Sequence, residues 1–109
     1  MQALSTTQKD FWSENGYLVI SNVIPELLLR NVVNTIEDFI GKRMDEPADW
    51  YKAPMYPGGI INMNHHQSFW ETRQHPDIHK IFSDIWGTKK LTVSQDRANM
   101  NPPANDQWD

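Results

Sequence analysis

PELLLRNVVNTIEDFIG, residues 25–41, contains the clearest structural pattern in this chain. Its apolar residues recur at steps of three and four, and charged and amide side chains fill most of the other positions. Proline is favoured at the first position of a helix, and glycine is favoured just after the last one. The pattern therefore predicts an amphipathic helix that begins near Pro25 and ends near Gly41. Its apolar face comprises Leu29, Val32, Val33, Ile36, Phe39 and Ile40.

Three other segments carry helix signals. Hydroxyl residues at 5–7 precede QKDFWSEN and offer it an N-terminal cap, and Gly16 ends that helix. Pro76 opens a second amphipathic helix, which Gly87 ends. Residues 67–73 predict a shorter helical turn.

Strand signals are few and lie far apart. Residues 17–20, YLVI, follow a turn signal and favour a short buried strand. A second strand is predicted to begin at Leu91 and to run to about Met100. Residues 43–62 between them contain several prolines and a Gly-Gly pair, which predicts a long loop. Because strands need partners, these strands are expected to be pieces of a larger sheet.

Composition restricts the classes of protein to which the chain can belong. Its 109 residues, 39% of them hydrophobic, suit one globular domain, which we assign to residues 1–109. A net charge of −4 without a basic stripe disfavours binding to nucleic acid or to a membrane surface. The absence of cysteine excludes disulfides and thiolate metal sites. Since the chain has neither a secretory signal nor an apolar span, we expect it to be cytoplasmic.

The four histidines, at positions 65, 66, 75 and 79, are the candidate metal ligands. His75 and His79 have a spacing that suits zinc on a helix, but Pro76 places His75 before the helix begins. His75 and Asp77 also form the His-x-Asp pattern of non-heme iron sites. The proline favours a helix start instead, with Asp77 stabilised by the helix dipole. A small zinc domain therefore remains the weakest of the hypotheses.

Two polar segments are candidates for ligand binding. Residues 63–70, MNHHQSFW, combine hydrogen-bonding groups with aromatic faces, as a small-molecule site requires. The alternative is a solvated loop that its aromatic residues anchor to the core. Residues 94–99, SQDRAN, place polar side chains along a predicted strand. These face either water or the interior of a barrel, where charged groups must be paired or bound to a ligand.

Residues 11–25, FWSENGYLVISNVIP, and residues 58–103 together resemble a known family. The second stretch is the more specific, through its RQHP, IWGT and DRANMNPP segments. The resemblance is to the N-terminal part of the phytanoyl-CoA dioxygenase family, and Thr92 departs from it where a large residue is expected. It covers nearly the whole chain, but only about the first two-fifths of a family domain.

The resemblance implies an α+β fold: the N-terminal helices and first strands of a double-stranded β-helix (jelly-roll) oxygenase, incomplete in this chain. Family members are dioxygenases that use Fe(II) and 2-oxoglutarate to hydroxylate a small organic substrate. Their metal-binding His-x-Asp follows the segment that corresponds to residues 91–103, so we expect no iron ligand and no catalytic residue here. The chain alone is expected to be inactive and to bind neither cofactor tightly.

What carries over from the family is one wall of a pocket for cosubstrate or substrate. The expected partners are a small molecule and either a complementing C-terminal segment or a second copy of the chain. The alternative hypothesis is a non-catalytic small-molecule-binding or interaction domain derived from the same family. The pocket-wall residues implied by the resemblance are Met63, His65, Gln67, Asp96, Arg97 and Asn99.

Overall fold

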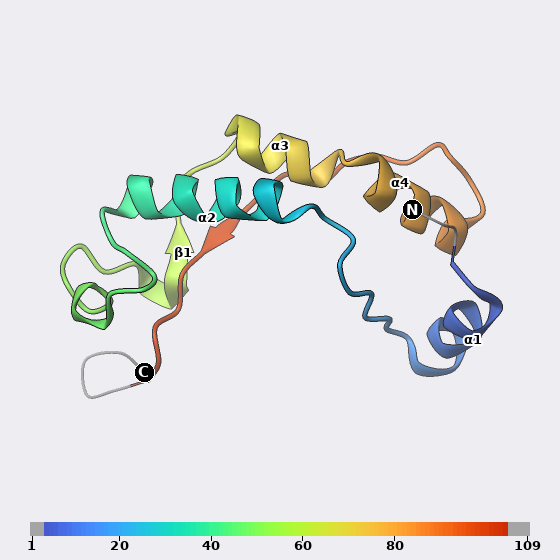
Figure 1. Cartoon of the computed structure of the whole chain (residues 1–109), viewed down its shortest axis with the longest axis horizontal. Helices are drawn as coiled ribbons and strands as arrows, with labels where there is room; N and C mark the ends of the chain where they lie inside the picture. The colour runs from blue at the N-terminus through green and yellow to red at the C-terminus, as the bar shows by residue number, and fades with distance from the viewer. Residues whose placement is uncertain (1–3, 105–109) are drawn as a thin grey trace.

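The computed structural model describes residues 4–104 of the chain, and four α-helices dominate it (Figure 1). They are joined by two single-turn 3-10 helices and one pair of very short strands. In chain order the elements are α1 (Thr6–Asn15), α2 (Glu26–Ile40), η1 (Pro47–Asp49), η2 (Pro57–Gly59), β1 (Ile60–Ile61), α3 (Gln67–Arg73), α4 (Pro76–Trp86) and β2 (Ala98–Asn99).

The helix α1 has the capping predicted from its sequence. Ser5 Oγ accepts a hydrogen bond from the Gln8 N–H at 3.1 Å, and Gln8 Oε1 accepts one from the Ser5 N–H at 2.9 Å. This reciprocal pair satisfies two of the N–H groups that a helix start leaves unpaired. Gly16 ends the helix in the left-handed conformation, with φ 76°. The prediction of this helix is confirmed.

The helix α2 lies where its pattern predicted it. Pro25 precedes the first helical residue instead of occupying it. Gly41, at φ 67°, donates its N–H to the Glu37 carbonyl at 2.9 Å and ends the helix. The predicted helices at 67–73 and from Pro76 to Gly87 are also confirmed, as α3 and α4.

A small core forms where α2 packs against α3 and the two strands. β1 and β2 pair antiparallel, with Ile60 opposite Asn99 and Ile61 opposite Ala98. Ile61 and Ala98 are each 2% exposed, and they cluster with Ile40 and Phe69. Figure 1 shows β1 beneath the middle of α2. The core thus joins segments that are distant in the sequence.

The strand predictions were largely wrong. Residues 17–20 form no strand, and Tyr17 and Val19 are 57% and 78% exposed. The strand predicted from Leu91 to about Met100 is reduced to β2, and β1 lies inside the predicted loop 43–62. A strand exists only where a second segment pairs with it, and within residues 4–104 none pairs with 17–20 or 91–97.

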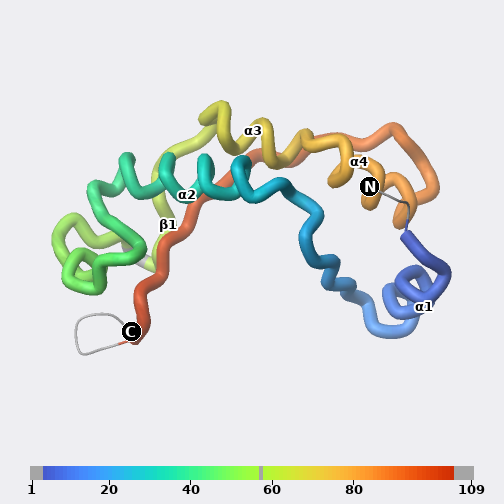
Figure 2. Tube along the Cα trace, in the orientation of Figure 1, coloured from blue at the N-terminus to red at the C-terminus, as the bar shows by residue number. Residues whose placement is uncertain are grey.

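The chain forms an open arch (Figure 2). Its radius of gyration is 17.0 Å, whereas a compact domain of this length has a radius of about 13 Å. At one end of the arch the segment before α1 is held to α4, where the Leu4 N–H donates to Asp84 Oδ2 at 2.8 Å. Within residues 4–104, no helix combines the length and apolar character needed to cross a bilayer.

Candidate functional site

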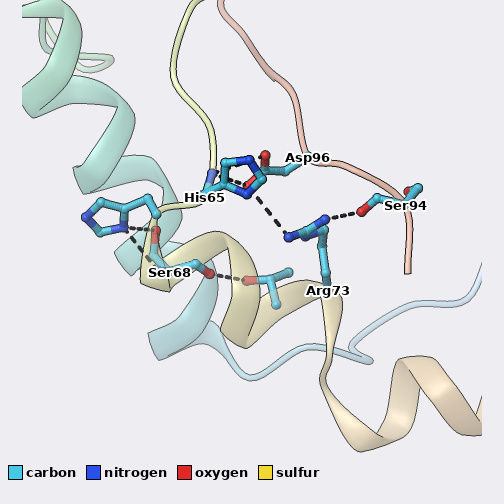
Figure 3. A network of polar contacts seen from close by, with 7 residues as sticks. His65, Ser68, Arg73, Ser94 and Asp96 are labelled. Atoms are coloured by element: carbon cyan, nitrogen blue, oxygen red, sulfur yellow. Dashed lines mark hydrogen bonds and ion pairs between the residues drawn. The ribbon is translucent and has the colours of Figure 1, made fainter. Parts of the chain in front are cut away.

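A buried carboxylate, that of Asp96, lies at the centre of a polar cluster (Figure 3). Its side chain is 6% exposed, and its two oxygens accept the His65 N–H at 3.0 and 3.3 Å. His65 has φ 65°, a conformation that is uncommon for a residue with a side chain. These hydrogen bonds join the loop before α3 to the segment before β2, which lie 31 residues apart in sequence.

Arg73, in the last turn of α3, is the cationic partner in this cluster. Its Nη2 lies 3.9 Å from Asp96 Oδ2, and its Nη1 donates to the Ser94 carbonyl. The guanidinium carbon lies 4.1 Å from the centre of the Trp70 ring, which is a cation–π contact. Nε and Nη2 of Arg73 are buried without a hydrogen-bond acceptor in the described residues. The cluster therefore contains a charge pair with unused hydrogen-bonding capacity.

His66 connects the cluster to α2. Its Nδ1 accepts the Ser68 N–H at 3.1 Å and so caps α3. Ser68 Oγ donates to Thr35 Oγ1 at 2.9 Å, and Thr35 Oγ1 donates to the Asn31 carbonyl at 2.7 Å. A continuous line of hydrogen bonds thus runs from the start of α3 into α2.

The structure brings together two of the six predicted pocket-wall residues, His65 and Asp96. Arg97 lines the same polar hollow as Asp96, on the β1 side. Met63 packs against the core and, with Gln67, lines a shallow depression between α2 and α3. Asn99 lines a third hollow, beside Trp50 and Met100. Five of the six residues therefore line three separate hollows, His65 contacts Asp96 through its backbone N–H, and the roles of all six stay predictions.

Sequence reasoning missed the residues that hold Asp96 in place. Arg73 and Trp70 are three apart on α3, a spacing that brings side chains together on a helix and could have revealed their contact. Asn64, with its amide oriented to satisfy its hydrogen bonds, donates to the Asp96 carbonyl at 3.1 Å. No local pattern indicates the contact between Arg73 and the Ser94 carbonyl, because it depends on how distant segments pack.

A second buried charge lies away from this cluster. Lys42 is 4% exposed, and its Nζ donates to the Met55 thioether at 3.4 Å. Burial lowers the pKa of Lys42, and the nearby Asp49 only partly opposes this effect. The pKa of Asp49 is itself lowered, first by the hydrogen bond from Lys52 and then by the Arg43 N–H. Lys42 is therefore a destabilising charge whose effect on folding depends on pH.

The described residues do not fit a metal centre. Within residues 4–104, no group of three or more His, Asp or Glu side chains is arranged to hold a metal ion. His65 stacks on Trp70, His66 and His75 cap helices, and His79 Nε2 lies 3.0 Å from the Lys89 carbonyl oxygen. No protein-family model, curated protein or solved structure matches this chain.

Proposed function

We propose that this chain forms part of the pocket wall of a non-heme Fe(II)/2-oxoglutarate-dependent dioxygenase of the phytanoyl-CoA dioxygenase type. The supporting observation is the contact between the His65 N–H and the Asp96 carboxylate. It joins residues 63–67 to residues 94–99, the two segments to which the resemblance assigns the wall. A buried carboxylate with several hydrogen bonds holds such a wall rigid.

In this proposal the role of this chain is to position a small molecule, and the iron site is not formed by the residues that the structure describes. The iron ligands lie elsewhere in the complete domain. When bound, Fe(II) and 2-oxoglutarate would supply the oxidising chemistry. Arg97, exposed at the edge of the polar hollow beside Asp96, offers a guanidinium to a carboxylate of the bound molecule.

The open shape of the chain also supports a larger fold. Its radius of gyration exceeds that of a compact domain of equal length, and residues 17–20 and 91–97 lack partner strands among the described residues. A double-stranded β-helix would supply those strands and would place the polar side chains of residues 94–99 against its interior.

The test uses the longest reading frame that contains this sequence. The purified protein is mixed with Fe(II) and 2-oxoglutarate, and the release of succinate is measured with and without a chelator. We expect chelator-sensitive release of succinate, and we expect a His-x-Asp or His-x-Glu pair downstream of residue 109. A reading frame that encodes no such pair would contradict the proposal. So would an encoded protein that releases no succinate.

The second candidate is a non-catalytic small-molecule-binding or interaction domain. It is favoured by large apolar side chains that remain exposed on the described surface, among them Trp86 at 66% and Leu27 at 69%. If the protein encoded by that reading frame is inactive but binds 2-oxoglutarate or a peptide, this candidate is supported instead.

A further inference from the structure

The buried ammonium group of Lys42 has a weak partner, the thioether of Met55. Lys42 lies just after α2, Met55 lies near the end of the loop that follows, and the Lys42 Nζ donates to the Met55 Sδ at 3.4 Å. A thioether is a weak acceptor, whereas an ammonium group offers three N–H donors. Lys42 is 4% exposed, so water has little access to it. Among the described residues, the donors of Lys42 are therefore poorly matched by acceptors.

The carboxylate that acts on Lys42 is engaged elsewhere. Burial lowers the pKa of Lys42, and the attraction of Asp49 only partly offsets this effect. One oxygen of Asp49 accepts from the Lys52 Nζ at 2.9 Å, and the other accepts from the Arg43 N–H at 3.2 Å. Because both oxygens already have donors, a better acceptor for Lys42 has to come from the group in contact with it, the Met55 sulfur.

Oxidation converts this weak acceptor into a strong one. Hydrogen peroxide transfers one oxygen atom to a thioether: the sulfur forms the new S–O bond and the O–O bond breaks. The hydroxide that leaves takes up the proton of the transferred oxygen and becomes water, so the sulfur loses two electrons and the peroxide gains them. The sulfoxide oxygen is polar and accepts hydrogen bonds far better than the thioether does. In one of the two sulfoxide epimers of Met55, the new oxygen extends from the sulfur toward the Lys42 Nζ.

The other internal methionines have different surroundings. Met44, Met63 and Met100 pack against the apolar core. A sulfoxide at any of these positions would place a polar oxygen among apolar side chains, which is the usual reason why methionine oxidation destabilises a fold. Met55 is only half-buried, so a small oxidant has access to it, and its sulfur contacts a donor. Oxidation should therefore have opposite effects at Met55 and at the core methionines.

We propose that Met55 is an oxidation site at which the sulfoxide oxygen accepts a hydrogen bond from Lys42 and so stabilises the fold. The bond joins the end of α2 to the end of the loop, 13 residues apart in sequence, and the oxidised chain holds this loop more tightly. Enzymes that reduce methionine sulfoxide restore the thioether, so the modification is reversible. The proposal does not depend on the oxygenase proposal, because neither residue belongs to the predicted pocket wall.

The experiment treats the 109-residue chain with hydrogen peroxide in two backgrounds. In the first, Met44→Leu, Met63→Leu and Met100→Leu leave Met55 as the internal methionine. In the second, Met44→Leu, Met55→Leu and Met63→Leu leave Met100 instead. Leucine and methionine have similar volumes, so a core tolerates these changes. Peptide mass spectrometry identifies the oxidised sulfur, and urea unfolding gives the folding equilibrium constant.

We expect oxidation of Met55 to raise the folding equilibrium constant and oxidation of Met100 to lower it. Lys42→Leu in the first background removes the donor, so oxidation of Met55 should then no longer raise the constant. Leucine is used at this position because it adds no further methionine. The sign of the change, and its dependence on Lys42, distinguish the proposed hydrogen bond from a general effect of oxidation.

A second measurement needs no oxidant. Met55→Gln places a carbonyl oxygen where the sulfoxide oxygen would lie, at the same distance along the side chain. Compared with Met55→Leu, it should raise the folding equilibrium constant roughly tenfold, because a hydrogen bond to a charged donor is gained. The same pair of substitutions in the Lys42→Leu chain should differ much less, which completes a double-mutant cycle. This cycle decides the question even if peroxide damages other side chains.

Three outcomes would overturn the proposal. One is that oxidation of Met55 lowers the folding equilibrium constant, as expected for Met100. Another is that the difference between Met55→Gln and Met55→Leu is the same with and without Lys42. The last is that peroxide oxidises Met55 only after the chain has been unfolded in urea, because the folded chain would then protect the sulfur.

Discussion

At the scale of single residues, two buried charges have opposite consequences. Asp96 is stabilised by the His65 N–H and by Arg73, so its burial is compensated. Among the described residues, Lys42 has only a thioether and a more distant carboxylate nearby, so its burial is poorly compensated. The sequence does not show this difference in compensation, because both residues have charged or polar neighbours along the chain.

Asp96→Ala should destabilise the fold by about 3 kcal/mol, because it leaves the guanidinium of Arg73 buried without its carboxylate. Asp10→Ala, on the exposed face of α1, is the matched control and should change stability by less than about 0.5 kcal/mol. Urea unfolding followed by Trp fluorescence measures both. Equal effects of the two substitutions would show that the polar cluster contributes little to stability.

Lys42→Met should stabilise the fold at neutral pH by about 1 kcal/mol, because it removes a poorly compensated buried charge. Since the pKa of Lys42 is lowered on folding, the unfolded chain binds more protons between the folded and unfolded pKa values. Stability should therefore rise with pH across this alkaline window, and the substitution should abolish the rise.

Lys52 provides the control for this pH dependence, because hydrogen bonding to Asp49 raises its pKa. Its contribution has the opposite sign and is lost as pH rises through the folded-state pKa. Urea unfolding at several alkaline pH values should show a rise that Lys42→Met removes and Lys52→Met does not. A rise that survives Lys42→Met would contradict the assignment.

At the scale of elements, the helices depend on local signals and the strands on distant ones. The line of hydrogen bonds from His66 through Ser68 to Thr35 is the polar part of the α2–α3 contact, and Ile40 and Phe69 are the apolar part. Because Ser68 is buried, its hydroxyl has no access to water as an alternative partner.

Ser68→Ala should destabilise the chain by about 1–2 kcal/mol, because it leaves the Thr35 hydroxyl without this donor at the α2–α3 contact. Ser13→Ala, an exposed position on α1, should change stability by less than about 0.5 kcal/mol. Thermal unfolding followed by circular dichroism compares the two variants. Indistinguishable transitions would mean that the apolar contacts alone hold α2 against α3.

The helices could be predicted because caps, prolines and glycines act within a few residues of each helix end. Ser5, Gly16, Gly41 and Gly87 each act as the sequence indicated. The strands could not be placed, since Ile60 and Ile61 pair with β2 across residues 62–97, which carry no pairing signal. For the same reason the sequence indicated Asp96 as a site residue but not Arg73, which holds it.

At the scale of the whole molecule, the open arch suits a chain that completes its core against other strands. The exposed apolar side chains are one consequence of this geometry, and segments 17–20 and 91–97, which pair with no strand among residues 4–104, are another. A larger domain would bury both.

The arch predicts how the 109-residue chain behaves in solution. Small-angle X-ray scattering at low concentration should give a radius of gyration near 17.0 Å, and calorimetry should show a broad thermal transition. A radius of about 13 Å with a sharp two-state transition would indicate a compact, self-sufficient domain instead.

Arg97 links the proposed oxygenase activity to this chain most directly. In the longest reading frame that contains the sequence, Arg97→Gln should lower kcat/KM for 2-oxoglutarate turnover by about tenfold, because a charge-assisted contact to the bound molecule is lost. Arg30→Gln, which removes an exposed guanidinium on α2, should leave kcat/KM within about twofold. Equal activity of the two variants would contradict the assignment of this chain to the pocket wall. So would the absence of 2-oxoglutarate turnover by the unaltered protein that this reading frame encodes.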